Sequence, residues 1–242
     1  MNATLTAATP SRTGESVLEQ IQDTVVVTID GPAASGKSSV SRELARRFGW
    51  VWVSTGAFYR GVAWAAHHSG VNLDDEEAVA EFARSNAWRV RLDLDQTRFE
   101  LHGEDSTEEI MKEAVGLLAS KISSYPKVRQ ALLDAQRRCA LGVKGLIAEG
   151  RDCGSVVFPQ AVVKIFLTAR AEARAARRAT EEGRDPGDVV EQQKRRDQQD
   201  ASRKAAPMVQ PEGSLAIDTS GLTLNEVVDQ IEMLILSKIS YS

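Results

Sequence analysis

One loop restricts the fold of this chain more than any other feature of its sequence. Residues 31–38 read Gly31-Pro32-Ala33-Ala34-Ser35-Gly36-Lys37-Ser38 and fit the pattern G-x-x-x-x-G-K-[ST]. The loop follows an apolar run at 25–29 and precedes an apolar helical stripe formed by Val40, Leu44 and Phe48. A strand before such a loop and a helix after it are the context in which the loop cradles phosphate. The pattern therefore predicts an α/β protein that binds a nucleoside triphosphate.

The same loop carries the side chains expected to act on the triphosphate. Its glycines allow successive backbone N–H groups to surround a phosphate, and the following helix directs its positive end toward that phosphate. Lys37 would add a full positive charge, and the Ser38 hydroxyl would bind Mg²⁺. We expect the ATP-binding residues to run from Gly31 through Ser39.

The composition limits the classes of protein that need to be considered. The chain has 242 residues, 42% hydrophobic side chains and a formal net charge of −4. This size and apolar content can support one large core, and the acidic balance argues against general nucleic-acid binding. Cys139 and Cys153 are too few for a disulfide framework, which fits a reducing, cytoplasmic location. No run of about 18 apolar residues is present, so we expect no membrane span.

The order of the apolar segments predicts a three-layer α/β sandwich of the P-loop NTPase type. Its core would be a doubly wound, parallel five-stranded sheet, because short apolar runs alternate with helical or loop segments. The five predicted strands are residues 25–29, 50–53, 145–148, 162–167 and 214–217.

The interval between the second and third predicted strands is far longer than one crossover helix requires. We therefore expect an inserted subdomain at about 55–140, between core segments 23–54 and 141–237. Within the insert, alternating residues at 88–92 and 98–101 predict a small antiparallel hairpin. Helical patterns follow over 107–123 and 127–140, with Pro126 at the break.

Three other segments lie outside this core pattern. Residues 1–22 have no apolar stretch after a basic start, so we interpret them as a mostly disordered leader rather than a signal peptide. Residues 171–204 are strongly charged around Gly183 and Pro186, which favours a short mobile lid over a solvated helical hairpin without function. Residues 238–242 form a tail.

Two charged segments follow predicted strands and would lie at the same sheet edge as the loop. The first reads Thr55-Gly56-Ala57-Phe58-Tyr59-Arg60, and its arginine fork suits a monophosphate. In the second, Glu149-Gly150-Arg151-Asp152, the glutamate resembles a Walker-B acid that could hold Mg²⁺ through water. Arg151 would contact the acceptor phosphate, and Asp152 could accept from a base amino group. Taken alone, the Arg–Asp pair is better explained as a local salt bridge.

Together these segments resemble the bacterial cytidylate kinase family over roughly residues 24–237. The motifs that carry the resemblance are GPAASGKSS, STGAFYR, ASKISSYPKVRQALLDAQR, GLIAEGRDCGSVVFP, VKIFLTAR and RRDQQDASRKAAPM, which occur in the family's order and spacing. The middle and later motifs are more specific than the phosphate loop. The resemblance implies transfer of the ATP γ-phosphoryl group to CMP or dCMP, with Mg²⁺ accompanying ATP and the enzyme acting as a monomer. It also implies that the insert at about 55–140 is a nucleoside-monophosphate-binding domain.

The resemblance also implies roles for individual side chains. For the cytosine base it implies Ser120, Arg129 and Asp152, which suit a ring that has one amino donor and two acceptors. The acceptor phosphate and sugar would be held by Arg60, Arg151, Arg196, Asp200 and Arg203, and Thr55, Gly56 and Tyr59 complete the CMP-binding set. The implied catalytic cations are Lys37, Arg151, Arg177 and Arg178, the last two reaching over ATP, with Arg177 also binding it.

Two positions depart from the family pattern, and two other functions stay open. Ser54 stands where the family usually has Asp, which affects the charge of the acceptor pocket, and Cys153 stands where the family is usually apolar. The alternatives are a related kinase with a different acceptor and a regulatory or scaffold protein that binds ATP without phosphoryl transfer. The sequence favours the enzyme because every implied catalytic position carries a competent residue type.

Overall fold

The computed structural model describes residues 3–6, 16–93, 95–183, 190, 198 and 208–240. The chain divides into two units by its contacts. Unit 1 comprises residues 1–25 and 49–146, and unit 2 comprises 26–48 and 147–242.

The main sheet has five strands in the order β3-β7-β2-β8-β9. These strands are β3 (Val51–Ser54), β7 (Gly145–Gly150), β2 (Val25–Asp30), β8 (Val163–Thr168) and β9 (Leu215–Asp218). In unit 2, β8 pairs in parallel with β2 on one side and with β9 on the other. Each strand falls on one of the apolar runs, so the predicted α/β class with a parallel five-stranded sheet is confirmed.

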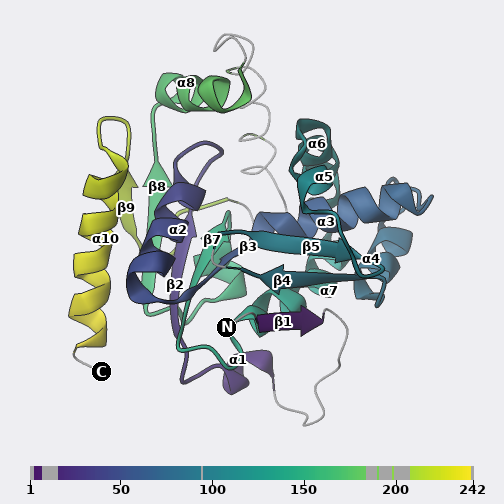
Figure 1. The fold of residues 1–242 in the computed structure, drawn as a ribbon, viewed down its shortest axis with the longest axis horizontal. Helices are drawn as coiled ribbons and strands as arrows, with labels where there is room; N and C mark the ends of the chain where they lie inside the picture. The colour runs from purple at the N-terminus through teal and green to yellow at the C-terminus, as the bar shows by residue number, and fades with distance from the viewer. Residues whose placement is uncertain are drawn as a thin grey trace. The chain divides into compact units, whose positions relative to one another are not determined.

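The helices of unit 2 begin after defined loops or caps. In the part of unit 2 that the structure describes, they are α2 (Lys37–Phe48), α8 (Ala171–Glu182) and α10 (Leu224–Ile239), with a five-residue π-helical turn, η2, at Cys153–Val157. A capping box between Thr223 and Glu226 starts α10. Helix α2 packs beside α10 (Figure 1), and both Leu44 of α2 and Ile231 of α10 are completely buried. This packing fixes the helix that follows the phosphate loop.

Unit 1 combines helices with a second, antiparallel sheet. The helices are α1 (Val17–Gln20), α3 (Thr55–His68), α4 (Glu76–Arg84), α5 (Thr107–Met111), α6 (Glu113–Ile122) and α7 (Pro126–Arg137), followed by a 3₁₀ turn, η1 (Arg138–Ala140). The sheet has the order β1-β4-β5-β6, from β1 (Ala3–Thr6), β4 (Trp88–Leu92), β5 (Thr97–Leu101) and β6 (Glu104–Asp105). The predicted hairpin is confirmed as β4 and β5.

One face of this second sheet forms an aromatic core with α3. The rings of Trp88 and Phe99 stack with their centroids 5.7 Å apart, and Phe58 of α3 meets Trp88 edge-on at 6.2 Å. Gly61 lets α3 approach, because a Cβ there would lie 2.0 Å from the Phe99 ring. The aromatic residues of the hairpin are therefore core residues.

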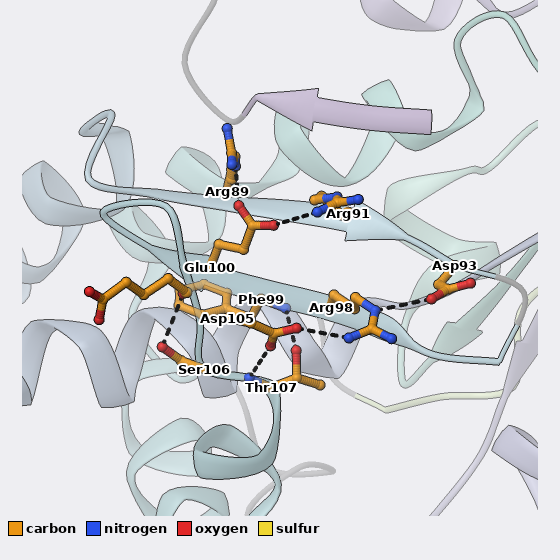
Figure 2. Close-up of polar contacts among 10 residues, drawn as sticks. Arg89, Arg91, Asp93, Arg98, Phe99, Glu100, Asp105, Ser106 and Thr107 are labelled. Carbon is orange, nitrogen blue, oxygen red and sulfur yellow. Dashed lines mark hydrogen bonds and ion pairs between the residues drawn. The ribbon is translucent and has the colours of Figure 1, made fainter. Parts of the chain in front are cut away.

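The opposite face of the second sheet carries charge (Figure 2). Glu100 accepts hydrogen bonds from the guanidinium groups of Arg89 and Arg91, the latter at 3.0 Å. Arg98 donates to Asp93 at 3.0 Å and to Asp105 at 2.8 Å. Positive and negative side chains thus alternate across neighbouring strands.

The structure corrects the expectation of one helix over 107–123. Lys112 has the extended angles φ −58° and ψ 143°, so the segment breaks into α5 and α6. Arg60 of α3 donates to the carbonyl oxygens of Ile110 (2.8 Å) and Lys112 (3.1 Å), on the two sides of the break. The Lys112 carbonyl also accepts from the Val115 N–H at 3.1 Å. A contact from a distant helix therefore stabilises a break that the local pattern did not reveal.

The disordered leader expected over 1–22 is wrong for two of its segments. Strand β1 pairs antiparallel with β4, and α1 begins with a capping box between Ser16 and Glu19. Val17 and Ile21 are buried, so they anchor α1 to unit 1. Helix α4 was also not anticipated, although Asp75 caps it by accepting from two backbone N–H groups. Within the described part of the chain, no helix combines the length and apolar character needed to cross a bilayer.

Candidate functional site

The phosphate loop lies in unit 2 between β2 and α2, and its curvature depends on glycine. Gly31 has φ +148°, and a Cβ there would lie 2.1 Å from the carbonyl oxygen of Leu167. Gly36 has φ +92°, and Ala34 also adopts a positive φ of 56°. The loop can therefore pass close to β8 and turn sharply into α2, which begins at Lys37.

Two polar side chains of the loop have defined partners. The Lys37 side chain is almost buried, and its Nζ donates to the carbonyl oxygen of Pro32 at 2.6 Å, so the ammonium lies within the curve of the loop. The Ser38 hydroxyl donates to the Glu149 carboxylate, with distances of 2.8 Å to Oε1 and 3.0 Å to Oε2. The structure thus brings together the two residues that the sequence predicts as magnesium ligands, from α2 and β7. The side-chain atoms of Ser38 and Glu149 that could bind a metal ion are all oxygens, which suits a hard cation such as Mg²⁺.

Helix α8 supplies arginines to the same region. Arg177 donates to the Thr219 hydroxyl at 2.9 Å and to the Thr219 carbonyl oxygen at 2.6 Å. The Thr219 hydroxyl in turn donates to the carbonyl oxygen of Ser35, in the phosphate loop, at 3.2 Å. Arg174, which sequence analysis missed, is buried and donates to the Ala33 carbonyl oxygen at 3.2 Å. Arg178 is half-buried on the same helix. Two arginines of α8 are therefore linked to the phosphate loop.

A cavity of about 400 Å³ opens beside the loop within unit 2. Its lining includes Val40 of α2, Arg177 and Thr180 of α8, and Leu222 and Val227 around the start of α10. Apolar walls with a few polar groups are typical of a site for a flat organic ring. The β9–α10 residues were missed because nothing in their sequence marks them as ligand-binding.

The segment after β7 is held by a buried acid. Asp30, the last residue of β2, accepts from the backbone N–H groups of Cys153 at 2.8 Å and Gly154 at 2.7 Å. Burial raises the pKa of Asp30 to about 6, the charge of nearby Asp152 adds to this, and the two backbone hydrogen bonds oppose it. Asp152 is buried and Arg151 half-buried. Sequence analysis missed Asp30, although an acid ending an apolar strand just before the loop was a usable signal.

In unit 1, three of the predicted acceptor residues lie together on α3, α6 and α7. The Arg129 guanidinium stands over the Tyr59 ring, 5.5 Å from its centroid, and donates to the carbonyl oxygen of Ser123 at 3.3 Å. The Ser123 hydroxyl in turn donates to the Ser120 carbonyl oxygen at 2.9 Å. Arg129 is therefore oriented by one aromatic ring and by the C-terminal end of α6.

The other predicted acceptor residues of unit 1 lie at the start of α3. Thr55 and Gly56 form its first turn, and Arg60 lies one turn further on, bound to the break between α5 and α6. Ser54, the unusual residue, is the N-cap of α3 but makes no side-chain cap hydrogen bond. Its backbone N–H donates to the Thr97 hydroxyl at 2.9 Å.

Three predicted residues and most of the predicted lid cannot be compared with the structure. Arg196, Asp200 and Arg203 lie outside the described residues, and of the lid at 171–204 the structure describes 171–183, 190 and 198. Cys153 is completely buried, in agreement with a packing role.

Comparison with known proteins adds an independent finding. A family model described as "Cytidylate kinase" matches residues 27–237. A cytidylate kinase of Bdellovibrio bacteriovorus is 56% identical over 215 residues, which cover 89% of this chain and 99% of that protein. Cytidylate kinases of Colwellia psychrerythraea and Neisseria meningitidis are 43% and 44% identical, covering 90% and 85% of this chain and 99% and 94% of their own lengths.

Proposed function

The chain belongs to the cytidylate kinase family, and we propose that the residues described above transfer the γ-phosphoryl group of ATP to the phosphate of CMP or dCMP. It is a nucleoside monophosphate kinase. The observation that carries the proposed site is the Ser38–Glu149 hydrogen bond of 2.8 Å beside the phosphate loop, because it joins a loop hydroxyl to an acid at a strand end. The regulatory or scaffold alternative is not favoured.

The donor nucleotide is assigned to unit 2. Residues Gly31 to Ser39 would hold the triphosphate, and the cavity beside α8 and α10 would take the adenine ring. The proposed catalytic cations are Lys37, Arg151, Arg177 and Arg178. They would stabilise the negative charge that spreads over the phosphoryl group during transfer.

The donor atoms fit one magnesium ion bound with ATP. Ser38 and Glu149 supply only oxygen ligands, and Mg²⁺ is commonly held by one or two protein groups together with phosphate and water. Ser38 and Glu149 would hold the ion, which would neutralise negative charge on the triphosphate.

The acceptor nucleotide is assigned to the CMP-binding residues that the family resemblance implies. The base would be read by Ser120, Arg129 and Asp152, because a carboxylate accepts from the cytosine amino group but repels the uracil carbonyl at the same position. The remaining proposed CMP-binding residues are Thr55, Gly56, Tyr59, Arg60, Arg151, Arg196, Asp200 and Arg203. The attacking phosphate oxygen is already largely ionised near neutral pH, so no general base is required.

The proposal includes a monomeric enzyme of the cytoplasm that binds no nucleic acid. Both cysteines are buried free thiols, which agrees with a reducing compartment. The net charge of −4 opposes binding to a phosphate polyanion. Gel filtration at several concentrations tests the monomeric state.

A coupled ADP-release assay tests the proposed function. The purified chain is given Mg²⁺–ATP with CMP, dCMP, UMP, AMP and GMP in parallel, and turnover confined to CMP and dCMP is expected. Lys37→Ala is the control for contaminating kinases, and it should lose at least about a hundredfold in kcat because it removes a charge beside the phosphates. Asp152→Asn should lower the preference for CMP over UMP by about tenfold or more. Efficient turnover of a different acceptor would contradict the assignment.

A further inference from the structure

Asp30 joins two functional segments of unit 2. It is completely buried and directly precedes Gly31, the first residue of the phosphate loop. Its two carboxylate oxygens accept from the N–H groups of Cys153 and Gly154, at 2.8 Å and 2.7 Å. These residues immediately follow Asp152 in the chain. One side chain therefore holds the backbone of the segment assigned to acceptor binding.

The hydrogen bonds of the turn η2 explain why its first N–H groups need a partner. The N–H groups of Val156 and Val157 donate to the Asp152 carbonyl oxygen, and that of Phe158 donates to the Cys153 carbonyl oxygen at 2.7 Å. The first N–H groups of any helical turn have no acceptor within the turn. In η2 those of Cys153 and Gly154 are satisfied by Asp30, a residue more than 120 positions earlier.

Asp152 occupies the N-cap position of η2 but does not cap it. Aspartate is among the strongest N-cap residues, yet the Asp152 side chain makes no cap hydrogen bond. We propose that Asp30 is a positioning residue, which caps η2 in place of Asp152 and so keeps the Asp152 carboxylate oriented toward the acceptor base. This inference rests on the proposed function, in which Asp152 reads the cytosine amino group.

Close packing restricts where the capped turn can lie. A Cβ on Gly154 would stand 2.7 Å from the Thr28 hydroxyl and 3.3 Å from Asp30 Oδ2, so the turn lies directly against β2. The charged and titratable groups that act on Asp30 are the Asp152 carboxylate and the Cys153 thiol, in addition to the two backbone donors. Near neutral pH the Asp30 carboxylate is ionised, and both of its oxygens act as acceptors.

Asp30→Asn tests the inference because it keeps the size of the side chain and removes one acceptor. The new NH₂ group would face a backbone N–H donor, so one cap bond is lost. We expect the KM for CMP to rise about tenfold, the preference for CMP over UMP to fall by a similar factor, and the KM for ATP to change by less than about twofold. Amide hydrogen exchange should accelerate at Cys153 and Gly154. Asp229→Asn, the same exchange at an exposed position on α10, is the matched control and should behave as the wild type.

The outcomes separate positioning from a merely structural role. Two outcomes for a folded Asp30→Asn variant would overturn the inference. In the first, the KM for CMP and the preference for CMP over UMP are unchanged. In the second, kcat falls equally for CMP and UMP while both KM values are unchanged. If this variant does not fold, Gly154→Ala tests the inference instead. Its methyl group would lie 2.7 Å from the Thr28 hydroxyl and 3.3 Å from Asp30 Oδ2, and would therefore push the turn away from β2 without changing charge. The same selective loss for CMP supports the inference, and wild-type kinetics overturn it.

The proposed function is tested separately. An Asp152→Asn enzyme that still prefers CMP over UMP contradicts the proposal that Asp152 reads the base. It then also contradicts the proposal that Asp30 caps η2 in order to orient Asp152. Accelerated exchange at Cys153 and Gly154 in Asp30→Asn would in that case show that the cap itself exists. Failure of the cap and failure of the function are thereby distinguished.

Discussion

Two buried carboxylates, Asp30 in unit 2 and Glu100 in unit 1, have opposite kinds of partners. Asp30 accepts from two backbone N–H groups of η2, whereas Glu100 accepts from the guanidinium groups of Arg89 and Arg91. Burial raises the pKa of Asp30 to about 6. Burial also acts to raise the pKa of Glu100, but the hydrogen bonds from the two arginines outweigh it and the pKa lies below its usual value.

The difference shows how the protein uses buried charge in each region. On the sheet of unit 1, Glu100 is neutralised by neighbours on the adjacent strand, so its ionisation stabilises the fold. At the end of β2 the charged neighbour that acts on Asp30 is another acid, Asp152, so the ionisation of Asp30 costs stability and supplies two strong acceptors to η2. The Asp30 charge thus destabilises the fold but holds η2, a segment assigned to substrate binding.

The largest expected effect is the pH dependence of stability conferred by Asp30. Its folded pKa of about 6 exceeds the ordinary 3.8, so the folded protein binds more protons than the unfolded chain between these values. The free energy of unfolding of the wild type minus that of Asp30→Asn should therefore fall by about 2 kcal/mol from pH 4 to pH 7. Urea denaturation of both proteins across this range measures the difference. A difference that increases with pH would mean that the Asp30 pKa is not raised.

The second largest effect on stability is expected at Glu100, where the charge stabilises the folded protein instead of destabilising it. Glu100→Gln removes the charge that pairs Arg89 and Arg91, whose side chains are 38% and 36% exposed and can turn to water. We therefore expect a loss of only about 1 to 2 kcal/mol in the free energy of unfolding at pH 7. Because the folded pKa is lowered, this stabilisation is present above the ordinary value of 4.5 and is lost as the pH falls through the folded pKa.

Urea denaturation at pH 7 and at acidic pH checks the Glu100 prediction, with Glu104→Gln on exposed β6 as the matched control. The control should leave stability nearly unchanged. A Glu100→Gln variant as stable as the control at pH 7 would show that the arginine pairs contribute nothing.

The smallest effect is expected at Arg98, on the same face of the sheet (Figure 2). Its pairs with Asp93 and Asp105 join side chains that are 32% to 44% exposed, so solvent screens them. Arg98→Ala should lower the melting temperature less than Glu100→Gln does, and the difference from the wild type should vanish in about 0.5 M NaCl. Melting curves at low and high salt measure this, and a loss that persists in high salt would contradict it.

Local patterns were sufficient to predict much of the fold. The apolar runs predicted all five strands of the main sheet, and alternation predicted the β4–β5 hairpin. The break at Lys112 was not predictable, because the side chain that binds the carbonyl oxygens on both sides of it, Arg60, comes from α3. The ordered α1 could have been recognised from the Ser16–Glu19 capping box, but its burial depends on contacts within unit 1.

Some residues of the candidate site were likewise predicted from the sequence, and others were not. The phosphate loop was evident from its spacing together with the apolar segments on either side of it, and Glu149 was indicated by its place at the end of an apolar run. Arg174 and Asp30 were missed, since their partners are carbonyl and N–H groups more than 120 residues away in the chain. No sequence pattern identifies which backbone group a distant side chain will meet.

The sequence by itself determined the phosphate loop, the strands and most of the helices, because glycine conformations, apolar periodicity and capping act over a few neighbouring residues. Only the tertiary structure decided that Asp30 caps η2, that Ser38 meets Glu149, and that Arg60 binds the break between α5 and α6. These contacts depend on how strands and helices distant in the chain pack together. Packing brings donors and acceptors within hydrogen-bond distance, and burial then makes each of them require a partner.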